Sequence, residues 1–238
     1  MIAPAAEVFD GLFATPKSLP TWLLYDETGC ELYERITELP EYYPTRVERE
    51  VLLRRADEIL AYAADGGSTF ALAEIGAGTA TKTEILIAAA LRRQPMCVYL
   101  ACDIAPEPLA TAAARLGRSC PGVDVRTVVG THLEAGPRVA ALEERQALLF
   151  LGSSIGNYSD LDAIALLGGL RRFLRDDALL VLGTDLKKDP RGLRAAYDDA
   201  QGVTAAFTMN VLTRLNREYA CDFQPHSFRH VAEWDEGA

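Results

Sequence analysis

The chain has 238 residues, of which 49% are hydrophobic and 24% are charged, and its formal net charge is −10 at pH 7. This length and composition indicate one large domain, or a domain with a smaller companion, around a substantial buried core. The acidic balance, with Lys and Arg scattered along the chain, argues against a nucleic acid or an anionic membrane as partner and favours a small-molecule substrate.

The first 66 residues have a helical pattern that prolines interrupt. Apolar residues recur at three- and four-residue steps over 31–39 and 46–64, which predicts two helices. Thr45 stands before the second stretch as an N-cap, and Glu48, three residues later, completes the pattern of a capping box.

Residues 67–186 alternate between short apolar runs and helical stretches. Strands are expected at 70–75, 97–102, 123–129, 147–152 and 178–183. Helices are expected between them at 82–92, 107–116, 139–144 and 161–174. Strands that alternate with helices in this way predict an α/β domain with a mostly parallel sheet, covered by helices on both faces.

The alternation stops near Asp185. The stretch 191–219 has a helical pattern, and the residues after it are mostly polar. Because the first strand begins only near residue 70, we expect residues 1–66 and 187–238 to form together a second, mainly helical lobe. It would accompany the sheet domain of residues 67–186.

The ends of the chain and its cysteines predict a cytoplasmic protein. The N-terminal segment lacks the basic stretch and following apolar stretch of a signal peptide. No apolar run approaches the ~20 residues that a membrane span requires. None of the five cysteines has C-x-x-C spacing, and a chain of this size does not need disulfides, so we expect reduced thiols.

The loop after the first strand is a candidate cofactor site. It reads GAGTATK from Gly76 to Lys82, and glycines at this place let backbone N–H groups approach a ligand at the start of the next helix. A dinucleotide fingerprint would have Gly or Ala at Thr81, beside the pyrophosphate, which disfavours a nicotinamide oxidoreductase. S-adenosylmethionine has no phosphates, so a loop with two glycines is enough for it, although such a loop is often only a tight turn.

Asp103 strengthens this interpretation. It ends the second strand, where a carboxylate can accept both hydrogen bonds of a ribose diol, although it could instead cap the helix that begins near Pro106. Lys82 is either a solvated lysine, which gains nothing from the helix dipole at that end, or the partner of the cofactor's carboxylate. The loop, Asp103 and Lys82 together predict a site for S-adenosylmethionine.

Polar residues follow the fourth and fifth strands, at the edge where α/β sheets bind ligands. The segment 152–157 ends in Asn157, whose amide suits an amine or a carboxylate, although a plain turn is the commoner role of such an Asn. Charged residues follow the fifth strand over 185–189, and Tyr197 stands in the next helical stretch. These residues line a cleft or form a solvated face.

Several segments of the chain resemble the histidine-specific N-methyltransferases of ergothioneine biosynthesis, which make trimethylhistidine. The matching segments are 39–46, which reads LPEYYPTR, the glycine loop together with Thr83, 150–157, 183–189 and 196–207. The resemblance extends from Pro16 to about Trp234. It implies a Rossmann-like class I methyltransferase fold, and transfer of methyl groups from S-adenosylmethionine to the α-amino group of L-histidine.

The resemblance also implies roles on the cofactor side. Gly76, Lys82 and Asp103 match residues that bind S-adenosylmethionine. After the third strand, where the family has an Asp and an aromatic residue at the adenine, this chain has Thr131 and His132. Threonine can hydrogen-bond the adenine amino group without charge assistance, and His132 can stack on the ring or serve only in packing. We expect both to bind the cofactor.

On the substrate side, Tyr42 matches a tyrosine that contacts the imidazole, and Asn157 and Tyr197 match residues that hold the amino and carboxylate groups. We expect Tyr42 and Asn157 to act in catalysis, by orienting the neutral amine while water or a carboxylate takes its proton. Alignment of nitrogen, carbon and sulfur should supply most of the rate. We expect no metal site, because His226 and His230 lack an evident third ligand.

The family continues beyond the last residue of this sequence. The further part supplies an acidic and a serine contact to the substrate and the last two strands of the sheet, so the chain resembles a family member truncated at its C-terminus. Its fifth strand would then be an uncovered edge, where we expect self-association or a partner chain. Two alternatives stay open: a non-catalytic or partner-dependent relative that only binds the cofactor, and a methyltransferase for another amino acid or an aromatic amine.

Overall fold

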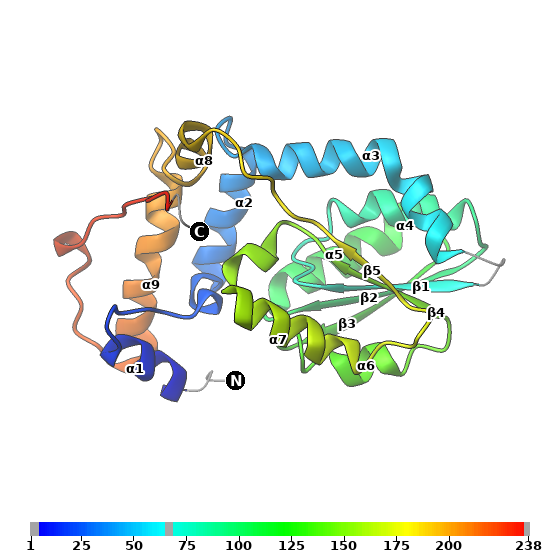
Figure 1. Cartoon of the computed structure of the whole chain (residues 1–238), viewed down its shortest axis with the longest axis horizontal. Helices are drawn as coiled ribbons and strands as arrows, with labels where there is room; N and C mark the ends of the chain where they lie inside the picture. Colours follow the sequence, from blue (N-terminus) through cyan, green and yellow to red (C-terminus); the bar gives the residue numbers. More distant parts are fainter. Residues whose placement is uncertain (1–4, 65–68, 236–238) are drawn as a thin grey trace. The chain divides into compact units, whose positions relative to one another are not determined.

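The computed structural model describes residues 5–64 and 69–235. Contacts within the chain divide it into two units, a sheet unit of Pro44–Leu186 and a helical unit that combines Met1–Tyr43 with Lys187–Ala238. Figure 1 follows both units along the chain. The helical unit therefore brings together segments from the two ends of the chain.

The sheet unit has five parallel strands. They are β1 (Phe70–Ile75), β2 (Cys97–Asp103), β3 (Val123–Val129), β4 (Arg145–Phe150) and β5 (Leu179–Leu182). Their order in the sheet is β3-β2-β1-β4-β5, and each neighbouring pair is parallel (Figure 1). The strand order reverses between β1 and β4, and such a switch point is where α/β sheets bind their ligands.

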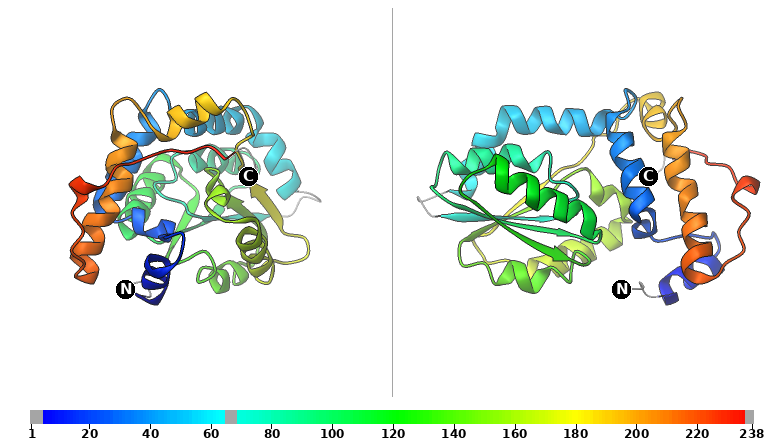
Figure 2. Two further views of the ribbon diagram at one scale, coloured as in Figure 1. Left: turned by 60° about the vertical axis from the view of Figure 1, so that its left-hand side comes forward. Right: turned by 180° about the vertical axis from the view of Figure 1, so that it is seen from behind.

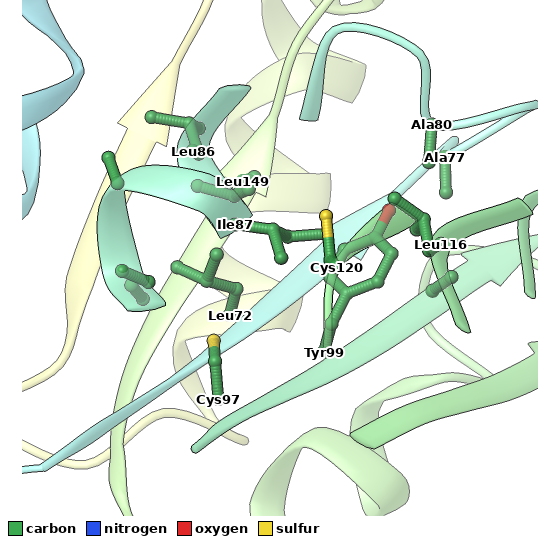
Figure 3. Close-up of a cluster of buried hydrophobic side chains, with 14 of the residues drawn as sticks. Leu72, Ala77, Ala80, Leu86, Ile87, Cys97, Tyr99, Leu116, Cys120 and Leu149 are labelled. Atoms are coloured by element: carbon green, nitrogen blue, oxygen red, sulfur yellow. The ribbon is translucent and has the colours of Figure 1, made fainter. Parts of the chain in front are cut away.

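Helices cover both faces of this sheet (Figure 2). They are α3 (Tyr43–Ala63), α4 (Thr83–Leu91) and α5 (Pro106–Ser119) on one face, and α6 (Gly136–Ala140) and α7 (Asp160–Arg171) on the other. On the first face Leu86 and Leu116 of the helices belong to one cluster with Leu72 and Tyr99 of the strands, as Figure 3 shows. The predicted α/β fold, with a parallel sheet covered on both faces, is confirmed.

Helix α3 belongs to the sheet unit, although the sequence groups it with the lobe of residues 1–66. Its residues Leu52, Ala56 and Leu60 are buried in the same cluster as the strands of the sheet. These contacts place the first boundary between the units before Pro44 rather than after residue 66. That the helical unit binds the substrate stays a prediction.

The start of α3 also differs from the prediction. The helix begins at Tyr43, with Pro44 in its first turn, where the missing N–H of a proline leaves no helical hydrogen bond unmade. Thr45 thus lies inside the helix, so the predicted capping box of Thr45 and Glu48 is wrong. The Glu48 carboxylate instead binds residues of the sheet unit that are distant in the sequence.

Among the described residues, β5 forms one edge of the sheet. Its side chains Leu180 and Leu182 are 40% and 37% exposed. An open apolar edge of this kind favours association with another chain. The expected self-association or partner chain at this edge stays a prediction.

The described residues of the helical unit form four α-helices and two short 3-10 helices. They are α1 (Ala5–Phe13), η1 (Thr21–Leu24), α2 (Glu27–Glu38), α8 (Pro190–Tyr197), α9 (Val203–Tyr219) and η4 (Pro225–Ser227). The predicted helix 191–219 is two helices, because the Asp199 carboxylate accepts hydrogen bonds from the N–H groups of Val203 and Thr204 and so starts a new helix there. No helix within the described ranges combines the length and apolar character that crossing a membrane requires.

Candidate active site

The loop that follows β1 has the conformation that its glycines predict. Gly76 and Gly78 have φ angles of +69° and +52°, which glycine adopts without strain, and Ala80 is also left-handed at +53°. The N–H of Ala77 donates to the carbonyl oxygen of Cys102 at 3.0 Å, which fixes the loop to β2. A Cβ added to Gly78 would meet no heavy atom of the described residues beyond its neighbours within 4 Å. The loop is therefore open to a ligand on this side.

Asp103 holds the loop from the end of β2. Its Oδ2 accepts a hydrogen bond from the N–H of Gly78 at 2.8 Å, and its Oδ1 accepts one from the N–H of Ala105 at 3.0 Å. The second bond lies directly before α5, so the carboxylate also serves the helix start. The structure brings Asp103 and the glycine loop together, and the contact of Asp103 with a ribose stays a prediction.

Glu74, two residues before Gly76, is a buried carboxylate that the sequence analysis did not single out. It is 3% exposed, and it accepts hydrogen bonds from the Thr83 hydroxyl at 2.7 Å and from the Tyr99 hydroxyl. Burial raises the pKa of Glu74 to about 7, although these two hydrogen bonds and the Lys82 ammonium oppose the rise. A single acidic residue in the apolar strand FALAEI is the sequence signal that could have identified it.

Lys82 is not a solvated surface lysine. Its Nζ forms an ion pair with Glu48 of α3, and the two side chains are 19% and 17% exposed. The other carboxylate oxygen of Glu48 accepts a hydrogen bond from the N–H of Gly152 at 2.8 Å. Lys82 follows β1 and Gly152 follows β4, so this group of residues spans the switch point of the sheet.

The two residues expected at the adenine have different local roles. Thr131 and Glu134 bind each other reciprocally: the N–H of Thr131 donates to Glu134 Oε2 at 2.8 Å, and the N–H of Glu134 donates to Thr131 Oγ1 at 3.4 Å. His132 packs against Phe150 with 5.3 Å between ring centroids, and its Nε2 would lie 3.8 Å from a Cβ on Gly76. The structure thus places His132 at the glycine loop and uses Thr131 in a turn. Cofactor contacts of both residues stay predictions.

The His132 imidazole is neutral near pH 7. Burial lowers its pKa below the ordinary value of 6.5, although the charge of Asp103 opposes this shift. A hydrogen bond of 3.0 Å joins His132 Nδ1 to the hydroxyl of Tyr158 and fixes the ring plane. A neutral aromatic ring held beside the loop suits a flat, uncharged ligand group better than an anion.

The loop after β4 carries Asn157. Gly152 and Ser153 are left-handed, at φ +77° and +57°, and Ser153 Oγ accepts a hydrogen bond from the N–H of Asp185 at 2.9 Å. This bond ties the loop to the segment that follows β5. Asn157 ends the short helix η3 (Ser154–Asn157) and its side chain is exposed. Its contact with a substrate stays a prediction.

Tyr42 and Tyr197 are neighbours in the helical unit. Their rings meet edge to face, with centroids 6.0 Å apart, and Tyr42 is 6% exposed whereas Tyr197 is 48% exposed. A hydrogen bond joins the side chains of Tyr42 and Tyr33, and burial raises the pKa of Tyr33. The Tyr33 ring in turn packs on Phe207 at 6.0 Å. The two expected substrate residues therefore belong to one aromatic cluster, and their substrate contacts stay predictions.

Hydrogen bonds within the helical unit hold the imidazole ring of His230. Its Nδ1 lies 2.9 Å from the Thr208 hydroxyl, and its Nε2 lies 2.8 Å from the carbonyl oxygen of Tyr197. Both ring nitrogens are thus engaged within the helical unit. Across residues 5–64 and 69–235, no group of three or more His, Cys, Asp and Glu is placed to hold a metal ion.

Comparison with known proteins places the chain in a family. A model of the histidine-specific, S-adenosylmethionine-dependent methyltransferases matches residues 4–238. The histidine N-alpha-methyltransferase of Mycolicibacterium smegmatis is 42% identical over 232 residues, which cover 96% of this chain and 70% of that protein. The protein of the same name from Mycobacterium tuberculosis is 41% identical over 237 residues, or 98% of this chain and 71% of the relative.

Two further similarities are weaker. Ergothioneine biosynthesis protein 1 of Neurospora crassa is 33% identical over 204 residues, which cover 84% of this chain and 23% of that protein. The crystal structure of a DUF574 family protein from Streptomyces avermitilis superposes with a TM-score of 0.48 at 18% identity, covering 84% of this chain and 72% of that one. The family match and the mycobacterial relatives confirm the predicted resemblance and, with it, the methyltransferase class and its cofactor. This chain belongs to the histidine-specific, S-adenosylmethionine-dependent methyltransferases.

Proposed function

We propose that this protein transfers methyl groups from S-adenosylmethionine to the α-amino group of L-histidine. The observation that carries the proposal is the 42% identity with a histidine N-alpha-methyltransferase over 96% of this chain. The likeness to ergothioneine biosynthesis protein 1 supports a place for this reaction in ergothioneine biosynthesis. The free state of all five cysteines fits a cytoplasmic location.

The residues around the glycine loop fit the cofactor. The loop is open above Gly78, and each oxygen of Asp103 uses one acceptor position for a backbone N–H and keeps a second for a ribose hydroxyl. Lys82 offers an ammonium group to the cofactor's carboxylate. The neutral ring of His132 beside Gly76 suits the adenine. Asp103, Lys82 and His132 therefore supply groups for the ribose, the amino-acid end and the base.

Methyl transfer requires a neutral amine whose nitrogen lies in line with the methyl carbon and the sulfur of the cofactor. Bound S-adenosylmethionine supplies a methyl group on a positively charged sulfur. The histidine nitrogen forms a bond to the methyl carbon while the carbon–sulfur bond breaks. In the first two transfers an amine proton passes to water or a carboxylate, whereas the third transfer gives a quaternary ammonium group and releases no proton. Charge is dispersed rather than created in this step, so positioning of the amine supplies most of the rate.

Asn157, Tyr42 and Tyr197 are the residues proposed to position the substrate. The amide oxygen of Asn157 can accept a hydrogen bond from the amine N–H and so direct the nitrogen lone pair. Tyr42 is held by Tyr33 and by the ring of Tyr197, which suits it to contact an imidazole from a fixed position. The half-exposed Tyr197 has a hydroxyl that can donate to a carboxylate.

The test is a survey of acceptors. The protein is incubated with S-adenosylmethionine and each amino acid in turn, and products are read by mass spectrometry. Histidine should gain one, two and then three methyl groups, and fragmentation should place them on the α-nitrogen. The matched control is Asn157→Ala, which should bind S-adenosylhomocysteine as the wild type does and form little product.

The same survey decides between the alternatives. Methylation of another amino acid or an aromatic amine, with no methylation of histidine, would show that the enzyme has a different acceptor and would refute the assignment to histidine. Binding of S-adenosylhomocysteine without methylation of any amine would show a relative that only binds the cofactor and would refute the proposed enzyme.

A further inference from the structure

Helical spacing places a carboxylate on the buried face of α3. Leu52, Ala56 and Leu60 recur every four residues and are buried against the sheet, and Glu48 stands one step earlier in the same series. Residues four apart lie on one face of a helix. A carboxylate on a face that is otherwise buried requires partners, because an unpaired charge is costly away from water.

Glu48 finds these partners in segments that are far apart along the chain. One carboxylate oxygen pairs with Lys82 Nζ, and the other accepts a hydrogen bond from the N–H of Gly152 at 2.8 Å. A Cβ on Gly183 would lie 2.2 Å from the second oxygen, so the carboxylate has room only because residue 183 is a glycine. Glu48 thus joins the segments that follow β1, β4 and β5.

The ion pair lies where the cofactor is expected. Lys82 belongs to the loop proposed to bind S-adenosylmethionine, and Gly152 begins the loop that carries Asn157. A lysine side chain is long and flexible, so an isolated ammonium would sample many positions. A carboxylate fixed at its other end by a backbone N–H confines that ammonium to one place.

We propose that Glu48 is a positioning residue, which holds the Lys82 ammonium at the switch point so that it can bind the carboxylate of the cofactor. This inference rests on the proposed function, because it assigns Lys82 to S-adenosylmethionine. Through Gly152 the same carboxylate also fixes the start of the loop that bears Asn157. Cofactor side and acceptor side would then share one anchoring group.

The experiment compares two ligands by calorimetry. S-adenosylhomocysteine has the amino-acid end that Lys82 would bind, and 5′-methylthioadenosine lacks it but keeps the adenosine and the sulfur. Glu48→Gln keeps the shape and can still accept from Gly152, but it cannot hold Lys82 by charge. We expect it to raise the Kd of S-adenosylhomocysteine by about tenfold and to leave that of 5′-methylthioadenosine unchanged.

Two controls frame the result. Lys82→Met should show the same selective loss, since it removes the group that Glu48 positions. Glu50→Gln, on the same helix but with a side chain that is 59% exposed, should leave both dissociation constants unchanged. If Glu48→Gln does not fold, Glu48→Asp keeps the charge on a side chain one methylene shorter and should give the same selective loss to a smaller degree.

Several outcomes would overturn the inference. An equal rise in the Kd of both ligands would show that Glu48 is only a structural contact. Unchanged Kd values for both ligands would show that Glu48 does not position Lys82 for cofactor binding. Tighter binding of S-adenosylhomocysteine would mean that Glu48 competes for Lys82 instead of positioning it. Failure of the wild type to bind either ligand would refute the proposed function itself, which separates the two failures.

Discussion

Replacing Glu74 by glutamine should change how the stability of the protein depends on pH. Glu74 is fully buried in β1, and its carboxylate is bound by the hydroxyl groups of Thr83 and Tyr99. Glutamine has nearly the same shape and keeps an oxygen that can accept from both hydroxyls. The substitution therefore removes the titration and little else.

The direction and the size of the change in unfolding free energy follow from the pKa of Glu74. Burial raises the pKa of Glu74 from 4.5 to about 7, so between these values the folded chain keeps a proton that the unfolded chain has lost. The free energy of unfolding therefore falls as pH rises through this window, by ~1.4 kcal/mol for each pH unit. From about pH 5 to about pH 8 the wild type should lose about 2–3 kcal/mol relative to Glu74→Gln, whose side chain stays neutral throughout.

The assay is urea unfolding followed by circular dichroism at several pH values across this window. The wild type and Glu74→Gln are compared with Glu58→Gln, whose side chain is 64% exposed and which should track the wild type. The quantity of interest is the difference in unfolding free energy between wild type and Glu74→Gln, in which the other titrating groups cancel. If that difference does not change with pH, Glu74 does not titrate in this window and the burial argument fails.

Four other substitutions test the remaining assignments. Asp103→Asn should raise the Kd of S-adenosylhomocysteine about ten- to hundredfold by calorimetry, because hydrogen bonds to a charged acceptor contribute about 1.5–3 kcal/mol. Tyr197→Phe should raise the KM for histidine about tenfold in steady-state kinetics, while the Kd of the cofactor stays constant. Burial lowers the pKa of His132 below 6.5, so at acid pH a protonated His132 beside the cationic S-adenosylmethionine should raise the Kd of that cofactor. His132→Phe should abolish this rise of the Kd at acid pH. Asp199→Ala should lower the urea midpoint by an amount equivalent to about 1–2 kcal/mol, because its carboxylate accepts hydrogen bonds from the first two N–H groups of α9.

The sequence predicts the parts of the fold that depend on local patterns. The strands are short apolar runs with helical stretches between them, and all five lie within two residues of their expected bounds. The conformation of the glycine loop is equally local, because left-handed φ angles at Gly76 and Gly78 follow from residue type. The place of Asp103 at the end of β2 also follows from the sequence, whereas its contact with the cofactor stays a prediction.

Contacts between distant segments account for what the sequence missed. The sequence pattern pairs Glu48 with Thr45 in a capping box, but its partners Lys82 and Gly152 are 34 and 104 residues away. In the sequence Glu74 is only one acidic residue within an apolar strand, whereas its hydrogen bond with Tyr99 joins positions 25 residues apart. A pattern along the chain does not contain such pairings, because they arise only when strands are ordered in the sheet.

The contacts of Glu48 give a physical reason for several motifs to occur together in this chain. The glycine loop supplies Lys82, the segment after β4 supplies the N–H of Gly152, and the segment after β5 supplies space at Gly183. Removal of Lys82 would leave a carboxylate without its counter-charge, and any side chain at 183 would displace that carboxylate from Gly152. Each of the three segments is therefore constrained by the other two through a single side chain. Gly183→Ala should consequently reproduce the selective loss of S-adenosylhomocysteine binding expected for Glu48→Gln. Wild-type binding by this variant would contradict the shared constraint.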